Sequence, residues 1–420
     1  MDVHLRIAAN NPAANIRDDQ AILRADGDSR RRFSGHGSAI AQAYNHSILP
    51  LCSPRDRKTQ IEWGLRDFER RFGRTPEGMW LPETAADTDT LEDLVDAGLR
   101  FTILAPHQAV DVRPPGRKDW RDVRGGRIDP RRGYLARLPS GRTLALFFYD
   151  GPVSQAVAFE QLLSNGDKFR ARLMGAFDSE RKGPQLVHIA TDGETYGHHH
   201  RHGDMALAYA LRAIEADPDV QLTNYGEHLE RFPPDHEVRI VERSSWSCVH
   251  GIERWRSHCG CSTGGRPGWN QEWRRPLRSA LDWLRDRLAE LYEDLAPRVL
   301  RAPWAARDAY VGVILDRSDA AIARFFAEHG RIAASTDPPD ERSPEAEQIT
   351  AAESASRPVG HLASIPNHRP RSGAAPVLQR SSANVGATKI TVPQAMAGAN
   401  ASSTSGVWER LIVRPPSRRS

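Results

Sequence analysis

The chain has 420 residues, of which 39% are hydrophobic, and this is enough for two or three domains with buried cores. Its net charge is +4 with basic and acidic residues interspersed, a pattern that favours a mixed solvated surface over a nucleic-acid-binding face. No apolar run approaches the roughly 20 residues that span a bilayer, and residues 1–20 lack the apolar core of a signal peptide. The four cysteines are too sparse for a disulfide scaffold. We therefore predict a cytoplasmic protein without nucleic-acid or membrane partners, and we leave its oligomeric state open.

Residues 1–34 are polar and irregular, and we expect them to be poorly ordered. The first clear helix signal is Ser53-Pro54-Arg55-Asp56, in which serine is the N-cap, proline holds the first helical position and an acid follows three residues after the cap. Gly73 is a plausible stop for this helix.

Short apolar runs then alternate with helical patterns to about residue 225. We predict strands over residues 78–81, 100–104, 143–149, 185–190 and 220–224. We predict helices over residues 54–72, 88–97, 153–163, 168–177 and 204–216. This alternation is typical of parallel strands covered by helices. The pattern therefore predicts an α/β fold that is either a barrel or a doubly wound sheet. Because four or five strands are too few to close a barrel, further strands must lie upstream or be missing.

The character of the chain changes near its C-terminal end. Apolar residues at helical spacing from Trp273 to Leu295 predict a long helix whose apolar stripe packs in a core. A second helix is predicted over residues 308–326. The region after it is rich in Ser, Ala, Pro and Gly, which predicts disorder, either as a linker or as a regulated interaction tail. The predicted divisions are a poorly ordered segment (1–34), an α/β region (35–240), a partial helical companion domain (241–330) and a disordered tail (331–420).

Two acidic segments follow predicted strands: Trp80-Leu81-Pro82-Glu83 and Thr191-Asp192-Gly193-Glu194. Carboxylates are costly to bury, and the catalytic groups of α/β barrels lie at the C-terminal ends of strands. Two carboxylates can cleave a glycosidic bond when one protonates the leaving oxygen and the other attacks the anomeric carbon or activates water. Spacing alone leaves open a structural role, such as a helix N-cap.

Wider motifs surround these carboxylates. They are His46-Ser47-Ile48-Leu49-Pro50-Leu51, Trp63-Gly64, Gly78-Met79-Trp80-Leu81-Pro82-Glu83-Thr84, Phe101-Thr102-Ile103-Leu104-Ala105-Pro106 and Thr191-Asp192-Gly193-Glu194-Thr195-Tyr196-Gly197-His198-His199. Together they closely resemble glycoside hydrolase family 57, the family of α-glucan branching enzymes, 4-α-glucanotransferases and amylopullulanases. The resemblance covers about residues 35–330 and is greatest to a bacterial branch with an uncharacterised companion domain. It implies an incomplete (β/α)7-type parallel barrel, and we expect the family's first strand, with its histidine and Gln-Pro motif, to be missing.

The resemblance also implies a chemistry. The family's nucleophile falls on Glu83, and its general acid/base falls on Asp192. A retaining mechanism on an α-glucan substrate follows, with a glycosyl-enzyme intermediate and no cofactor. For these roles Asp192 needs a raised pKa while Glu83 stays ionised. The balance of hydrolysis and transfer stays open.

Six further residues are predicted to bind substrate, and for three of them a structural role stays open. The six are His46, Trp80, Asp150, Glu194, His198 and Trp246. His46 could instead be a loop or core histidine, Trp80 a core residue and Asp150 a helix N-cap.

We expect no metal site. The histidine run over residues 198–202 is a poor candidate, because adjacent histidines on an extended segment point in different directions. The alternative is a zinc site at Cys248, Cys259 and Cys261, set against buried free thiols.

Two competing functions complete the predictions. One is a catalytically impaired glucan-binding remnant, motivated by the missing first strand. The other is a metal-dependent polysaccharide hydrolase of the deacetylase kind, motivated by Asp192 and the histidine run.

Overall fold

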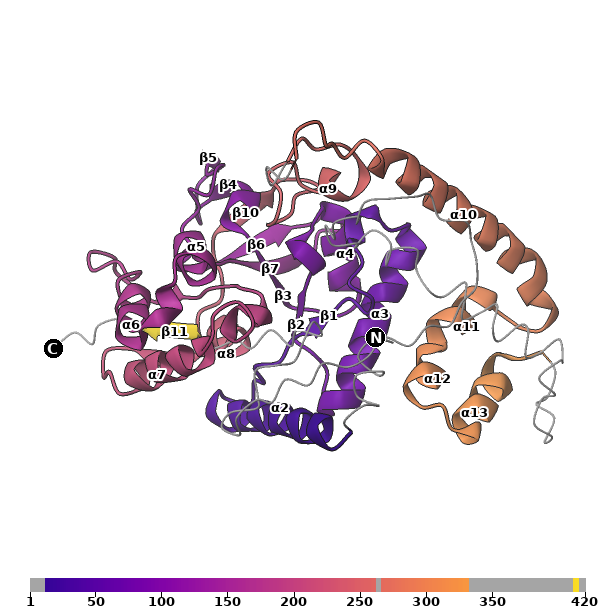
Figure 1. Cartoon of the computed structure of the whole chain (residues 1–420), viewed down its shortest axis with the longest axis horizontal. Helices are drawn as coiled ribbons and strands as arrows, with labels where there is room; N and C mark the ends of the chain where they lie inside the picture. Colours follow the sequence, from indigo (N-terminus) through magenta and orange to yellow (C-terminus); the bar gives the residue numbers. More distant parts are fainter. Residues whose placement is uncertain (1–11, 262–265, 332–410, 415–420) are drawn as a thin grey trace.

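The computed structural model describes residues 12–261, 266–331 and 411–414 (Figure 1). Within these residues, eight strands form one sheet in the order β1-β2-β3-β7-β6-β10-β4-β5. They are β1 (Ala41–Gln42), β2 (Gly78–Trp80), β3 (Phe101–Leu104), β4 (Ala109–Arg113), β5 (Arg121–Asp122), β6 (Gly133–Arg137), β7 (Thr143–Phe148) and β10 (Glu237–Ile240). A second sheet places β11 (Leu411–Arg414) between β8 (Gln185–Val187) and β9 (Gln221–Thr223).

The predicted α/β class is confirmed, and the large sheet is open rather than closed into a barrel. β1, β2, β3 and β7 are parallel neighbours, and the alternating pattern predicted parallel pairing for the strands that become β2, β3 and β7. Beyond β7 the sheet becomes mixed, because β6 runs antiparallel to β7 and β4 runs antiparallel to β10. The pattern did not predict these outer strands, since each is short and contains at least one arginine or acidic residue.

Helices flank the sheets and continue into the C-terminal region. They are α2 (Pro12–Arg32), α3 (Pro54–Phe72), α4 (Thr88–Asp96), α5 (Gly151–Phe159), α6 (Gly166–Met174), α7 (Gly203–Glu215), α8 (Tyr225–Arg231), α9 (Glu253–Arg256), α10 (Arg274–Leu295), α11 (Pro303–Ala309), α12 (Val311–Leu315) and α13 (Asp319–His329). α3 begins as predicted, with the Ser53 hydroxyl accepting the Asp56 backbone N–H at 3.2 Å. It ends at Gly73, whose left-handed φ of 64° suits glycine.

The prediction of an irregular N-terminal segment is wrong for Pro12–Arg32, which form α2. The Asp26 carboxylate of this helix is buried and pairs with the Arg74 guanidinium at 2.8 Å. Asp26 also accepts the backbone N–H of Ala39 at 2.8 Å. A helix tied to the domain by polar contacts of this kind has little apolar periodicity, so a pattern search passes over it. Residues 1–11 lie outside the described residues.

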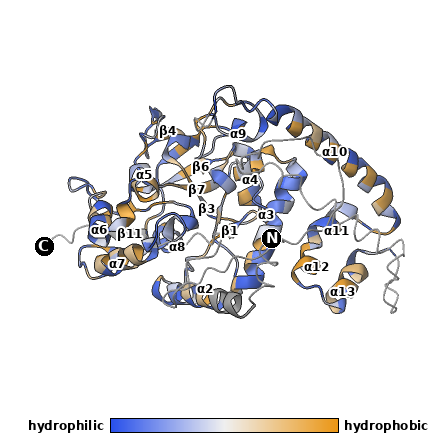
Figure 2. Cartoon of the chain, viewed as in Figure 1, coloured by the Kyte–Doolittle hydropathy of each residue, from blue (hydrophilic) through white to orange (hydrophobic). Residues whose placement is uncertain are grey.

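The long helix predicted near residue 273 is confirmed as α10, but the prediction that its apolar stripe packs in a core is wrong. Trp283 is 64% exposed and Leu291 53% exposed, and apolar residues follow the helix over its length (Figure 2). Among the described residues, only part of α10 rests against other elements, and one tie is Arg278, which donates to the Leu51 carbonyl oxygen.

The prediction of a single helix over residues 308–326 is also wrong, because this stretch is divided among α11, α12 and α13. Asp316 is extended, and the Ser318 hydroxyl accepts the Ala321 N–H at 3.2 Å, so a new helix starts there. The Trp63 indole of α3 donates to the Asp308 carbonyl oxygen at 2.8 Å, which joins this helical group to the α/β region.

Disorder was predicted over residues 331–420, and the strand Leu411–Arg414 contradicts it at that position. This strand pairs antiparallel with both β8 and β9, so its order comes from long-range pairing that local composition does not reveal. Residues 332–410 and 415–420 lie outside the described residues. Among the helices that are described, none is both long and apolar enough to cross a membrane.

Candidate active site

The two carboxylates singled out from the sequence follow strands. Glu83 comes shortly after β2, and Asp192 follows β8. Tyr149 directly follows β7, the strand that is linked to β2 through β3. The Asp150 backbone N–H donates to the His188 carbonyl oxygen at 2.9 Å, which joins the end of β7 to the chain just after β8. These positions gather at the carboxyl ends of the strands, where α/β folds place their sites.

Glu83 lies in a strained turn. Its φ is 57° and that of Thr84 is 48°, so two consecutive residues with β-carbons adopt the left-handed conformation. Each such residue costs on the order of 1 kcal/mol or more, and it persists only where the surroundings enforce it. A turn held in this way presents the Glu83 side chain in one direction.

The fully buried amide of Gln108 enforces this turn. Its oxygen accepts the Thr84 hydroxyl at 2.7 Å, and its NH2 group donates to the Thr84 carbonyl oxygen at 2.8 Å. The same NH2 group donates to the Ser244 hydroxyl at 3.0 Å. Ser244 in turn exchanges backbone hydrogen bonds with Ala86 on the far side of the turn. The backbone around Glu83 is therefore held by contacts from two distant segments.

The Glu83 carboxylate is itself held by donors. The Trp246 indole N–H donates to Oε2 at 3.1 Å, and His46 Nε2 lies 4.0 Å from Oε1. Burial by itself would raise the pKa of Glu83, but hydrogen bonds from His46, Ser247 and Trp246 outweigh it and lower the pKa below its usual value. Glu83 is thus kept ionised.

The surroundings of Asp192 shift its pKa in the opposite direction. The surrounding protein atoms desolvate its carboxyl group, and the negative charges of Glu83 and Glu194 act in the same direction, so its pKa is raised. Asp192 is nevertheless an exposed residue, so this desolvation does not come from full burial. The Asp192 side chain also makes no cap hydrogen bond at the short helical turn that follows it. The carboxyl group therefore holds a proton more readily than an ordinary aspartate, and no capping bond occupies it.

Three aromatic rings pack together at this site. Trp80 and Trp246 meet edge to face with ring centroids 5.0 Å apart, and Tyr149 and Trp246 do so at 6.2 Å. Trp246 is the residue that donates to Glu83, while burial and the charge of Asp192 both raise the pKa of Tyr149. The three rings thus connect the surroundings of one carboxylate to those of the other.

Comparison with known proteins identifies the α/β region. The model for glycosyl hydrolase family 57 matches residues 33–241, and a model for a domain of unknown function matches residues 269–340. Residues 33–241 belong to family 57.

The individual relatives are distant. The α-amylase 1 of Dictyoglomus thermophilum is 24% identical over 144 residues, covering 34% of this chain and 20% of that protein. The 4-α-glucanotransferase of Thermococcus litoralis is 20% identical over 226 residues, covering 51% of this chain and 31% of that protein. The chain therefore spans only about a fifth to a third of the length of these relatives. The solved exo-type maltose-forming amylase of Pyrococcus sp. ST04 shares the fold, with a TM-score of 0.52, 16% identity, and coverage of 72% of this chain and 52% of that one.

Within this family 57 region, some predicted substrate residues have clear structural contacts. Trp80 is 6% exposed and packs in the core, which favours the alternative that was kept open for it. The Asp150 carboxylate accepts the Val153 N–H at 2.9 Å, so it is the N-cap of α5. His46, in contrast, lies beside Glu83 with 44% of its side chain exposed.

The other three candidates lie around the two carboxylates. Trp246 donates a hydrogen bond to Glu83, and the negative charge of Glu194 raises the pKa of Asp192. His198 is exposed and packs edge to face against His199. The charge of His199 opposes the rise in the pKa of Asp192. Within the histidine run, it is His199 that lies near Asp192.

Three residues of the site were missed from the sequence, namely Gln108, Tyr149 and Ser247. Tyr149 ends the strand predicted over residues 143–149, and Gln108 lies shortly after the strand predicted over residues 100–104, so the strand-end argument applied to Glu83 could have found them. Ser247 carries no signal of its own, since it reaches Glu83 only through the folding of residues 241–252 over the sheet. The predicted domain boundary at residue 240 separates this segment from the site that it completes.

Proposed function

We propose that this chain is a retaining glycoside hydrolase or transglycosidase that acts on α-glucans, with Glu83 as nucleophile and Asp192 as general acid/base. The observation that carries the proposal is the opposite shift of two interacting carboxyl groups, since the pKa of Glu83 is lowered and that of Asp192 is raised. A pair of acids whose surroundings separate their pKa values in this way is ready for one charged role and one proton-donating role. Family 57 membership and the α-glucan-active relatives support the substrate class.

In the first step, the Glu83 carboxylate attacks the anomeric carbon while Asp192 gives its proton to the leaving oxygen. A glycosyl ester on Glu83 and a shortened glucan with a free hydroxyl group result. In the second step, Asp192 removes a proton from water or from a sugar hydroxyl, whose oxygen displaces Glu83 and completes hydrolysis or transfer. Trp246 and His46 hold the Glu83 carboxylate by hydrogen bonding and charge, and so keep one oxygen directed for attack.

The stereochemistry of azide products tests both roles. Maltosyl fluoride needs no acid to leave, so Asp192→Asn should still form the glycosyl ester, and added azide should yield the α-glycosyl azide. In Glu83→Gln no ester forms, so azide should attack directly and yield the β-glycosyl azide. Product configuration is read by NMR. The same azide configuration from both variants, or wild-type turnover in either one, would refute the assignment.

An assay with unmodified maltoheptaose tests whether the protein is active and whether it hydrolyses or transfers glucans. Shorter and longer glucans from the wild type indicate transfer, whereas shorter glucans alone indicate hydrolysis. A folded protein that binds glucans but forms no product supports the impaired remnant instead. The deacetylase alternative gains no support from the structure, because the group of metal-type donors found among the described residues lies at Cys248 and not around Asp192.

A further inference from the structure

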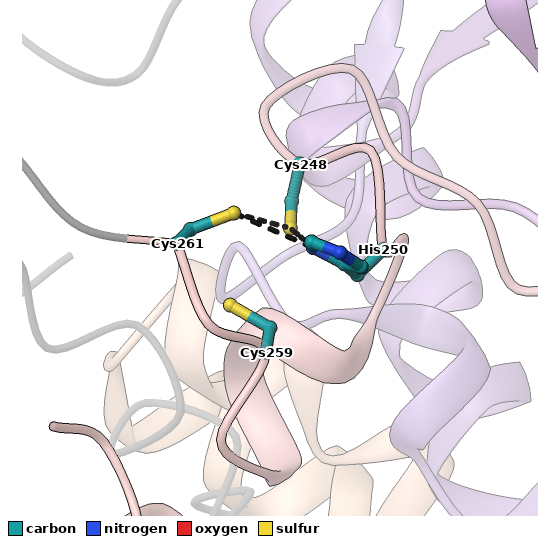
Figure 3. Close-up of side chains that lie close together, drawn as sticks. All are labelled: Cys248, His250, Cys259 and Cys261. Atoms are coloured by element: carbon teal, nitrogen blue, oxygen red, sulfur yellow. Dashed lines mark hydrogen bonds between the residues drawn. The ribbon is translucent and has the colours of Figure 1, made fainter.

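A second cluster of reactive side chains lies outside the carboxylate site. It consists of Cys248, His250, Cys259 and Cys261, here called the Cys/His cluster (Figure 3). One ligand atom from each residue lies within 4.8 Å of the others. The thiols come from two separate turns, one before α9 and one after it, and both turns direct their side chains to the same point. Two of the three thiols, those of Cys248 and Cys259, are buried.

The spacing of these atoms matches a tetrahedral metal site. Zinc–sulfur bonds of about 2.3 Å and zinc–nitrogen bonds of about 2.0 Å place tetrahedral ligands roughly 3.5–3.8 Å apart. The sulfur atoms of Cys248 and Cys261 are 3.7 Å apart, and His250 Nδ1 lies 3.4 Å from Cys261 Sγ and 3.8 Å from Cys248 Sγ. A disulfide would bring two sulfur atoms to about 2.0 Å, and all of these cysteines are free.

We propose that the Cys/His cluster binds one structural zinc ion through three thiolates and His250 Nδ1. Four protein ligands fill the tetrahedron and leave no position for water or substrate, which is the pattern of structural and not catalytic zinc. Soft thiolate ligands favour zinc over magnesium or calcium. Binding releases three thiol protons to solvent and leaves a site with one net negative charge. The Arg274 guanidinium lies 3.7 Å from Cys259 Sγ, where it offsets that charge as an outer partner.

The position of the cluster indicates which segment a bound zinc ion would stabilise. Cys248 lies two residues after Trp246, whose indole holds Glu83. The loop from Cys248 to Gly251 is a tight turn, in which the Gly251 backbone N–H donates to the Cys248 carbonyl oxygen at 2.9 Å. Gly251 has a φ of 62°, and a β-carbon there would lie 2.1 Å from the Arg243 carbonyl oxygen. The zinc ion would join this loop to the turn that leads into α10, and so fix the segment that carries Trp246.

The first test is the metal content of the full chain, purified without a histidine tag and passed through chelator-treated buffer. We expect about one zinc ion per chain by elemental mass spectrometry. Replacement of zinc by cobalt should produce the strong visible bands and thiolate charge-transfer absorption of a tetrahedral thiolate site. Neither readout depends on catalytic activity, so failure of the proposed enzyme function would leave this test unaffected.

Variants provide the control. Cys259→Ser and His250→Gln should lose most of the bound zinc, whereas Cys52→Ser should keep it, because Cys52 belongs to another part of the chain and contacts the Ile48 carbonyl oxygen. If a ligand variant fails to fold, hydrogen exchange of the wild type after chelation replaces it. Exchange should then rise over residues 243–261 and stay unchanged in α3.

Two results would overturn the proposal. One is a folded wild-type protein that contains no zinc, takes up no cobalt and reacts at all three thiols. The other is a native mass lower by two hydrogen atoms with a Cys248–Cys261 linkage in peptide maps, which would identify a disulfide.

Discussion

The Glu83 turn and the Asp192 loop support their carboxyl groups in opposite ways. Around Glu83, Gln108 and Ser244 hold a strained backbone, and Trp246 and His46 act on the carboxylate itself. Around Asp192, desolvation and then the neighbouring negative charges raise the pKa of a side chain that makes no capping bond. One group is anchored and kept charged, while the other is left open and pushed toward its neutral form.

This difference fits the two roles that we propose for these groups. A nucleophile must stay ionised and directed at one atom, so several donors and a rigid turn favour it. An acid/base must exchange a proton with ligands that change between the two steps, so permanent partners would compete with its function. Single substitutions can separate these two kinds of support, and their expected effects range from loss of nearly all turnover to a small change in stability.

The largest effect is expected for Glu83→Gln, which should lower turnover of maltoheptaose by about 10⁴-fold or more because no glycosyl ester forms. The variant should also be less stable near neutral pH by about 1 kcal/mol, since the lowered pKa means that the fold favours the ionised form. That stabilisation is present above the unfolded-state pKa of a glutamate and is lost as pH falls through the lowered folded-state pKa. Urea unfolding of both proteins should therefore converge in acid, and equal stability at every pH would contradict the prediction.

Asp192→Asn should lower turnover of unactivated glucans by about 10²–10⁴-fold. In the wild type, activity should fall as pH rises through the raised pKa of Asp192, because the acid form is lost, and this alkaline limb should vanish in the variant. Since a raised folded-state pKa means that ionised Asp192 is a cost to the fold, the variant should be at least as stable as the wild type near neutral pH. A variant that keeps the alkaline limb would assign the proton to another group.

Gln108→Leu tests the anchoring of the turn. Loss of the amide leaves the Thr84 carbonyl oxygen and the Ser244 hydroxyl without a buried partner, which should lower the free energy of unfolding by about 1–3 kcal/mol. Turnover should fall about tenfold, because Glu83 is less well directed. The matched control is Gln185→Leu, which removes another buried amide that bonds Asp178. The control should lose stability and keep its turnover, so equal losses of turnover would show a general structural effect.

Asp150→Ala is expected to give the smallest effect. It removes the N-cap of α5 and should lower the free energy of unfolding by about 1 kcal/mol. Turnover and KM should stay within threefold of the wild type. A higher KM without a loss of stability would instead support the substrate-binding role first predicted for Asp150.

Much of the α/β frame could be predicted because its signals are local. Ser53 and Gly73 define the ends of α3 by capping, and the apolar runs that become β3 and β7 are buried on both sides. The same locality accounts for the failures. α2 depends on the ion pair of Asp26 with Arg74, 48 residues away, and the strand Leu411–Arg414 depends on partners near residues 186 and 222.

The candidate site divides in the same way. The residue types at Glu83 and Asp192, and their positions after strands, are properties of the sequence, so motifs alone could single out the pair. Their opposite pKa shifts could not be predicted, because a pKa depends on the atoms within a few ångströms, and here those atoms come from His46, Trp246 and Glu194.

The amino-acid sequence by itself determined the fold class and the family and singled out the two carboxylates as candidates, because strand periodicity, helix caps and motifs depend on neighbouring residues. Tertiary structure decided which groups surround them: the Gln108 amide under the Glu83 turn, the exposed face of α10, and the convergence of three cysteines with His250. Contacts between distant segments set both the electrostatics and the geometry of metal ligands, and the spacing of residues along the chain carries little information about either.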